Sequence, residues 1–185
     1  SHGAANTWTA GCGSARGMRS PRHPQEDRMA DFFDRIVILK QTPIFAEVAT
    51  DDLRVVVEQM EEEAYFADER VFEINDPSDR MYIVLTGKIG ISIDPNPKSR
   101  AFVSIVEAGG CFGEMGPLDG SPRSGTAHVI ADSQLLYLDK LKLHGLIARY
   151  PELAFGLLHG MSARVRETSD KLLHARNGSA GKKGN

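Results

Sequence analysis

Apolar residues change their spacing twice along the chain, and each change marks a different kind of secondary structure. From about residue 31 to residue 60 they recur every three or four positions, which predicts two helices separated by Pro43. From about Ala64 to Leu138 they form short runs between turn residues, which predicts β-strands. After Asp139 the helical spacing returns and continues to about His174. The order is therefore helices, about eight strands, then helices.

Local residue chemistry predicts where several of these elements begin. Thr50 is a candidate N-cap, and the acidic residues that follow it suit the positive end of a helix. Asp139 is a second candidate cap, and Pro151 suits the first turn of the last helix. In the strand region, Gly87 and Asp132 lie in short turn-like breaks, each of which is expected to separate two strands.

Short strands separated by frequent turns are typical of an antiparallel sandwich or jelly roll. The predicted fold class is mainly β with flanking helices: an antiparallel eight-stranded jelly-roll barrel with helices before and after it. The composition, 41% apolar and 25% charged residues, is that of a globular chain. Both ends lack apolar periodicity, so residues 1–30 and 176–185 are predicted disordered tails around a domain at 31–175. Residues 1–3 resemble a cloning remnant, and Met18 and Met29 both remain candidate native starts.

Charge and composition disfavour several classes of partner. Residues 31–175 hold 15 basic against 23 acidic residues, and an acidic body repels nucleic acid. No apolar run approaches the roughly 20 residues of a membrane helix, so no membrane partner is expected. The chain shows no secretory signal, and Cys12 and Cys111 are interpreted as free thiols, so a cytoplasmic location is predicted.

The sequence offers little support for catalysis. The six histidines lack metal-ligand spacing, which argues against a metal cofactor and against a metalloenzyme of the jelly-roll type. The G-x-S-x-G motif of many hydrolases is also missing from the sequence. We therefore predict that the protein is not an enzyme and has no cofactor.

One segment, residues 109–128, combines groups suited to a ribose phosphate. Its glycines allow backbone to approach a ligand, and residues 116–118 are expected to form a short helical turn with Pro117 at its first position. Glu114 could accept hydrogen bonds from a sugar diol, and Arg123 could pair with a phosphate. The alternative is that Glu114 and Arg123 simply form a salt bridge with each other.

As a string, the segment resembles the phosphate-binding cassette of the cyclic nucleotide-binding domain family. Three further segments, at residues 39–45, 76–89 and 150–153, resemble other motifs of that family, so the similarity covers about residues 36–173. Pro117, Gly125 and Asn75 depart from the usual residues, but Glu114 and Arg123 are both present.

The resemblance implies a ligand and a set of roles. Glu114 would bind the ribose 2′-hydroxyl, and Arg123, the only basic residue of the cassette, would neutralise the cyclic phosphate. The binding residues implied are Gly113, Glu114, Met115, Gly116, Arg123 and Ser124. The ligand would be cyclic AMP or cyclic GMP, with Ser124 favouring cyclic AMP. The last helix, with Leu172 and Leu173, would close over the base as a lid, making the domain a sensor or regulatory module.

A second hypothesis comes from a different class. The last helix carries an a/d seam of two heptads, a pattern that more often packs on its own domain than forms a coiled coil. The seam consists of Leu158, Met161, Val165, Thr168 and Leu172. A domain of this fold that binds no nucleotide and dimerises through its last helix is therefore kept as the alternative. The expected partners are a cyclic nucleotide and either a second copy or an output domain outside this chain. Too few residues follow His174 for a helix-turn-helix module within this chain.

Overall fold

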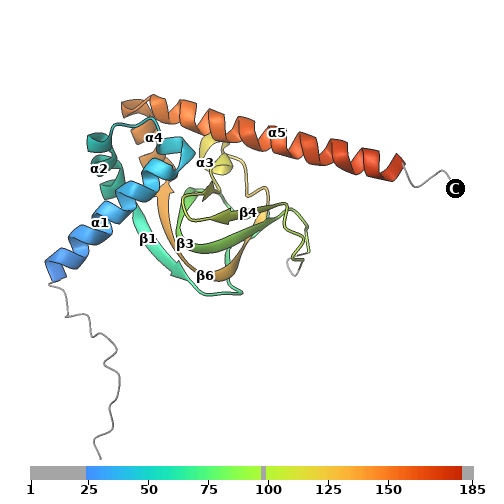
Figure 1. Ribbon diagram of the computed structural model, residues 1–185, viewed down its shortest axis with the longest axis horizontal. Coiled ribbons are helices and arrows are strands. Elements are labelled where there is room, and N and C mark those ends of the chain that lie inside the picture. Colours follow the sequence, from blue (N-terminus) through green and yellow to red (C-terminus); the bar gives the residue numbers. More distant parts are fainter. Residues whose placement is uncertain (1–23, 97–98, 181–185) are drawn as a thin grey trace, which may run out of the picture.

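The computed structural model of the protein describes residues 24–96 and 99–180. Two helices and one 3-10 helix precede the sheet: α1 (Pro24–Gln41), η1 (Pro43–Phe45) and α2 (Thr50–Gln59). The helices α4 (Lys140–Arg149) and α5 (Glu152–Ala180) follow it. Figure 1 shows α1, α2 and α4 gathered at one end of the sheet, while the long α5 runs past it toward the C-terminus. The predicted order of elements is confirmed.

The helix boundaries differ from the predicted ones in three places. Helix α1 begins at Pro24, before the predicted start near Asp31, because Pro at the first position and the polar helix formers after it extend the helix outward. Helix α5 continues to Ala180, beyond His174. Ala49, and not Thr50, is the N-cap of α2, and no side chain caps that helix. The remaining predicted tail residues, 1–23 and 181–185, lie outside the described residues.

The sheet is antiparallel throughout, and among the described residues it has six strands, so the predicted eight-stranded barrel is not what the structure has. The strands are β1 (Glu61–Tyr65), β2 (Arg70–Phe72), β3 (Arg80–Ser92), β4 (Ser104–Glu107), β5 (Cys111–Phe112) and β6 (Thr126–Asp139). Their order is β1-β6-β3-β4, with β2 paired to β6 and β5 paired to β3. The two long strands, β3 and β6, form the centre of the sheet.

The sheet has fewer strands than predicted because two of the predicted breaks do not end a strand. Gly87 and Asp132 were each expected between two strands, but Gly87 lies inside β3 and Asp132, with its neighbour Ser133, lies inside β6, where the register of the two strands shifts. Gly87 has a φ of +95°, and a Cβ there would lie 2.1 Å from the Ser133 hydroxyl. That hydroxyl accepts a hydrogen bond from the Lys88 amide. These residues therefore form a β-bulge that bends the ladder without stopping it.

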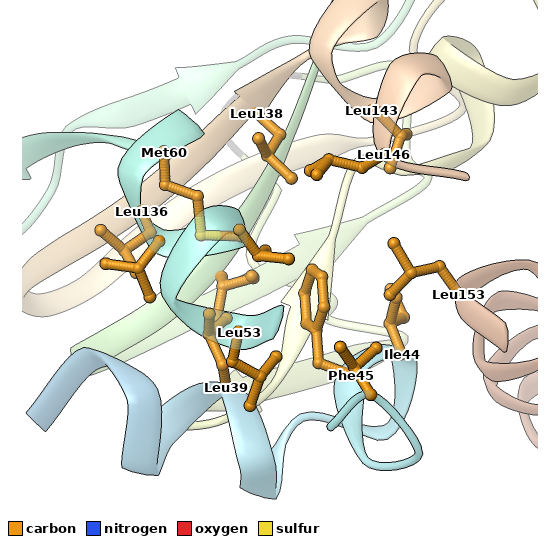
Figure 2. Packing of buried hydrophobic residues seen from close by; sticks show 14 of the residues in the cluster. Leu39, Ile44, Phe45, Leu53, Met60, Leu136, Leu138, Leu143, Leu146 and Leu153 are labelled. Carbon is orange, nitrogen blue, oxygen red and sulfur yellow. The ribbon is translucent and has the colours of Figure 1, made fainter. Parts of the chain in front are cut away.

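Both faces of the central strands are buried, and each face has its own apolar cluster. Met81 and Ile83 of β3 pack with the helices, in the cluster that Figure 2 shows around Phe45, Leu53 and Leu153. The intervening residues of β3, Tyr82 and Val84, join Phe112 and others in a second cluster on the opposite face. The second cluster includes aromatic side chains that lie beside the candidate site.

Helix α5 is packed at its beginning and exposed farther along. Leu153 and Leu157 are buried, and Gly156 lies against the backbone of η1, where a Cβ would come 2.4 Å from the Ile44 carbonyl oxygen. Leu158 and Val165, by contrast, are 59% and 66% exposed. The predicted packing of the a/d seam on its own domain is therefore wrong at these positions. The side chain of Leu172 lies outside the described residues.

Candidate functional site

The cassette residues lie where the sheet, a short helix and α5 meet. Gly113 directly follows β5, and Glu114 is the N-cap of α3 (Met115–Asp119). The helical turn predicted here is present, but it begins at Met115, so Pro117 is its third residue and not its first. All six predicted binding residues line one cavity: Gly113, Glu114, Met115, Gly116, Arg123 and Ser124. The structure therefore brings the whole predicted set together.

Arg123 is held by groups that leave its charge unneutralised. The side chain is buried, and Nη1 donates to the carbonyl oxygens of Arg80 at 2.7 Å and Gly113 at 2.8 Å. The guanidinium lies 4.0 Å from the centre of the Phe72 ring, a cation–π contact. Its Nε has no hydrogen-bond partner among the described residues. Burial lowers the pKa of Arg123, yet a guanidinium stays charged at neutral pH.

The backbone of Arg123 is fixed as firmly as its side chain. Its amide donates to the Asp76 carbonyl, and its carbonyl accepts from the Asn75 amide, each at 2.9 Å. Asn75 has a φ of +71°, which is the conformation that brings this turn against Arg123. The loop after β2 therefore positions the guanidinium in the cavity.

Glu114 is paired, but with a residue that the sequence did not point to. Its carboxylate is buried, and Oε1 accepts a hydrogen bond from Arg164 Nη1 of α5 at 2.8 Å. The alternative pairing of Glu114 with Arg123 is therefore not the one the structure has. Glu114 Oε2 has no partner among the described residues. One carboxylate oxygen thus contacts α5, and the other has no partner among the described residues.

Arg164 adds a second cation to the cavity that Arg123 lines. The sequence analysis gave Arg123 as the only basic residue of the cassette, and within that segment this is correct. The cavity, however, also contains Arg164, which comes from α5, about fifty residues farther along the chain. Arg164 lies among other charged residues of a helix, and no motif marks it. Only the fold shows its role. Ser78 and Phe72 of the loop and strand opposite also line the cavity and were not predicted.

Helix α5 approaches the site with a different segment from the predicted one. A second hollow lies between α3 and α5, lined on the helix side by residues Met161, Arg164, Val165, Thr168 and Ser169. Leu173, expected to cover the base, is 56% exposed. At the rim of the site, the exposed Ser124 hydroxyl lies 3.7 Å from the Met115 sulfur.

Other kinds of site find little support in the part of the chain that the structure describes. Over those residues, no three His, Cys, Asp or Glu side chains come together in a way that would hold a metal. Nor does any helix within the described ranges have the length and apolar character to cross a membrane. Cys111 is a free thiol, and burial raises its pKa to about 12, so it is a poor nucleophile.

Comparison with known proteins agrees with this geometry. Residues 62–150 match the family model described as cyclic nucleotide-binding domain. The crystal structure of a cyclic nucleotide-binding domain from Methylobacillus flagellatus superposes with a TM-score of 0.67 at 28% identity, covering 79% of this chain and 84% of that one. Residues 62–150 therefore carry a match to the cyclic nucleotide-binding domain family, and the fold is similar to that of a solved cyclic nucleotide-binding domain.

Two curated relatives are longer proteins. A putative potassium channel protein of Rhodopseudomonas palustris is 28% identical over 124 residues, which is 67% of this chain and 30% of that protein. A CRP-like cAMP-activated global transcriptional regulator of Mycobacterium tuberculosis is 27% identical over 121 residues, 65% of this chain and 54% of the regulator. The chain thus spans a third to about half of these relatives.

Proposed function

We propose that the protein is a sensor module that binds a cyclic nucleotide in the cavity of Arg123 and Glu114, and that it acts by regulation and not by catalysis. The observation that carries this proposal is that two buried, oppositely charged side chains, Arg123 and Glu114, line one cavity without pairing with each other among the described residues. Among the described residues Arg123 forms no salt bridge: its side chain donates to carbonyl oxygens and lies near the rings of Phe72 and Tyr82, so its charge is available to a phosphate. Glu114 keeps one buried oxygen without a partner among the described residues, which suits a ribose hydroxyl.

The roles of the other cassette residues follow from their positions. The amides of Met115 and Gly116 begin a helix and need acceptors, so they can bind phosphate oxygens together with the backbone of Ser124. We assign cyclic AMP as the preferred ligand over cyclic GMP. Ser124 at the rim and the cAMP-activated regulator among the relatives support this assignment.

Ligand binding is proposed to act on α5 through Arg164. The Arg164–Glu114 ion pair joins the helix to the group that would bind the ribose. It also neutralises a carboxylate that would otherwise repel the incoming phosphate. A ribose hydroxyl that donates to Glu114 Oε2 would add a third group to the Arg164–Glu114 ion pair. This would change the strength with which the ion pair holds α5.

Titration calorimetry with the site variants tests the binding proposal. Arg123→Ala should weaken cyclic AMP binding by about 30-fold to several thousand-fold, since truncating one member of a buried charge pair costs about 2–5 kcal/mol. Arg123→Lys should also bind weakly, because an ammonium cannot repeat the planar fork. Glu114→Ala should cost less, about 1.5–3 kcal/mol for a charged hydrogen bond. A folded Arg123→Ala variant that binds cyclic AMP as tightly as the wild type would contradict the assignment of Arg123 to the cyclic phosphate.

Hydrogen exchange tests the role of α5. Ligand should increase the protection of amides in residues 160–173, and Arg164→Ala should reduce this effect while Arg164→Lys restores part of it. Arg166, exposed on the same helix, provides the control, because Arg166→Ala should leave the ligand effect unchanged. Equal exchange of α5 with and without nucleotide would contradict the proposed movement.

The second candidate function is an interaction module that binds no nucleotide. The exposed apolar residues of α5, among them Leu158 and Val165, favour it because they could pair with a second copy. Sedimentation equilibrium distinguishes the two: a stable dimer that Val165→Asp dissociates, together with no nucleotide binding, would support this alternative.

A further inference from the structure

The cavity contains a buried hydroxyl that the cassette does not account for. Ser78 belongs to the loop between β2 and β3 and lines the same cavity as Glu114, Gly116 and Arg123. Its Oγ is buried and has no hydrogen-bond partner among the described residues. Buried hydroxyls are almost always hydrogen-bonded, because an unpaired one loses its bonds to water. An unpartnered hydroxyl that lines a cavity therefore indicates a hydrogen-bonding group for a bound ligand.

Hydrogen bonds hold the loop on both sides of Ser78. The Asp76 carboxylate accepts a hydrogen bond from the Glu73 amide at 2.8 Å. The Asp79 carbonyl accepts one from the Lys140 amide at 2.7 Å. Ser78 is thus fixed between two anchored neighbours, one of which is tied to the start of α4.

The helix opposite has room for Ser78 because of a glycine. A Cβ built on Gly116 would lie 2.0 Å from the Ser78 Oγ and 2.1 Å from its Cβ. Any side chain at position 116 would therefore displace the serine. Because Gly116 has none, the hydroxyl lies against the first turn of α3 and lines the cavity together with Arg123.

Resting on the proposed function, we infer that Ser78 is a further ligand-binding residue, whose hydroxyl donates a hydrogen bond to an exocyclic oxygen of the cyclic phosphate. The two unpartnered buried oxygens of the cavity require opposite groups: ionised Glu114 Oε2 only accepts, whereas a hydroxyl also donates. A nucleoside cyclic phosphate supplies both, a sugar hydroxyl for Glu114 and an anionic oxygen for Ser78. Donation to a charged oxygen is the strongest use of such a hydroxyl.

Calorimetric titration of Ser78 variants with cyclic AMP tests the inference. Ser78→Ala should weaken binding by about tenfold to a hundredfold, the range for a hydrogen bond to a charged group. Ser78→Cys keeps the size of the side chain but is a weak donor, so it should lose nearly as much. If Ser78→Cys binds like the wild type while Ser78→Ala does not, Ser78 only packs against Gly116 and the inference is wrong.

Phosphorothioate analogues give a readout that a packing role would not change. In each of the two diastereomers of cyclic AMP phosphorothioate, sulfur replaces a different exocyclic oxygen and accepts hydrogen bonds poorly. The penalty of Ser78→Ala should fall to less than about threefold for one diastereomer and persist for the other, because removing both partners of one bond is not additive. Equal penalties for both diastereomers would overturn the inference. Failure of the wild type to bind any cyclic nucleotide would instead overturn the proposed function.

Discussion

The two buried charges of the cavity are stabilised in opposite ways. Arg123 is surrounded by two carbonyl oxygens and an aromatic ring, which lower the cost of burial without cancelling its charge. Glu114 pairs with Arg164, so its charge is largely cancelled. The net result is a cavity that attracts an anion at Arg123 and does not repel it at Glu114.

The turn that holds Arg123 depends on one residue with positive φ. Asn75 has a φ of +71°, a conformation that costs other L-residues roughly 1–2 kcal/mol and costs asparagine less. Asn75→Ala should therefore lower the free energy of unfolding by about 1 kcal/mol, while Asn75→Gly should keep it within about 0.5 kcal/mol of the wild type. Urea denaturation of the three proteins measures this. Equal stability of the alanine and glycine variants would show that the turn is not constrained by its φ.

The cassette could be recognised from the sequence because its residues are contiguous and their spacing is specific. Glu114 and Arg123 were predicted in this way, and the structure brings them to one cavity. Arg164 and Ser78 could not be found, because each is a common residue in an ordinary context. Their place in the cavity depends on how α5 and the β2–β3 loop pack, which spacing along the chain does not encode.

Among the elements, α5 is divided between a packed and an exposed part. Its first turns are held by Leu153 and Leu157 in the main apolar cluster, whereas the later turns contact the cavity chiefly through Arg164. A helix that is anchored at one end and, among its described side chains, held by the Arg164–Glu114 ion pair farther along can respond to a ligand at small cost. In Figure 1, α5 extends well beyond the sheet.

Two glycines of α5 provide a matched test of where it is anchored. At Gly156 a Cβ would meet the Ile44 carbonyl oxygen at 2.4 Å, so Gly156→Ala should lower the free energy of unfolding by about 1–3 kcal/mol through overpacking. At Gly160 nothing lies within 4 Å of such a Cβ, so Gly160→Ala should stabilise the helix by up to about 1 kcal/mol. Thermal and urea unfolding measure both. The same change in stability for the two variants would contradict the packing of α5 on η1.

The strands show why turn residues in a sequence do not always end an element. Gly87 and Asp132 have the composition of a turn, yet β3 and β6 continue through them as bulged strands. At the bulge the Lys88 amide donates to the Ser133 hydroxyl, a contact between residues 45 positions apart. The sequence could predict an antiparallel, mainly β fold, but not which interruptions are bulges.

At the scale of the whole molecule, the sheet has two buried faces with different tasks. One face packs on the helices and supplies most of the core, and the other includes the aromatic residues around Arg123. Phe72, Tyr82 and Phe112 contact one another there, and Phe72 also supports the guanidinium. The site is therefore built on the centre of the fold, and Arg164 of α5 lines it from the other side.

A buried histidine makes the stability of the whole fold depend on pH. His128 of β6 is buried, and its Nε2 has no hydrogen-bond partner among the described residues. Burial, with Arg70 and Arg100 nearby, lowers its pKa from the usual 6.5, and Glu73 opposes this only in part. The unfolded chain therefore binds a proton more readily, so the free energy of unfolding should fall as the pH drops below about 6.5.

Urea denaturation between pH 7.5 and 5.5 measures this dependence. His128→Gln should show a shallower loss of stability than the wild type, because the glutamine does not titrate. His159→Gln is the control, since His159 is exposed on α5 and should leave the pH dependence unchanged. An identical pH dependence in the wild type and His128→Gln would show that His128 does not contribute.

The central claim is that the cavity of Arg123 and Glu114 binds a cyclic nucleotide, and titration calorimetry of the wild-type protein tests it most directly. Cyclic AMP, cyclic GMP and the open-ring 5′-AMP would be titrated at one fixed ionic strength, with circular dichroism to confirm the fold. We expect both cyclic nucleotides to bind one molecule per chain, cyclic AMP more tightly, and 5′-AMP far more weakly than either. A folded protein that binds neither cyclic nucleotide, or binds 5′-AMP equally well, would contradict the claim.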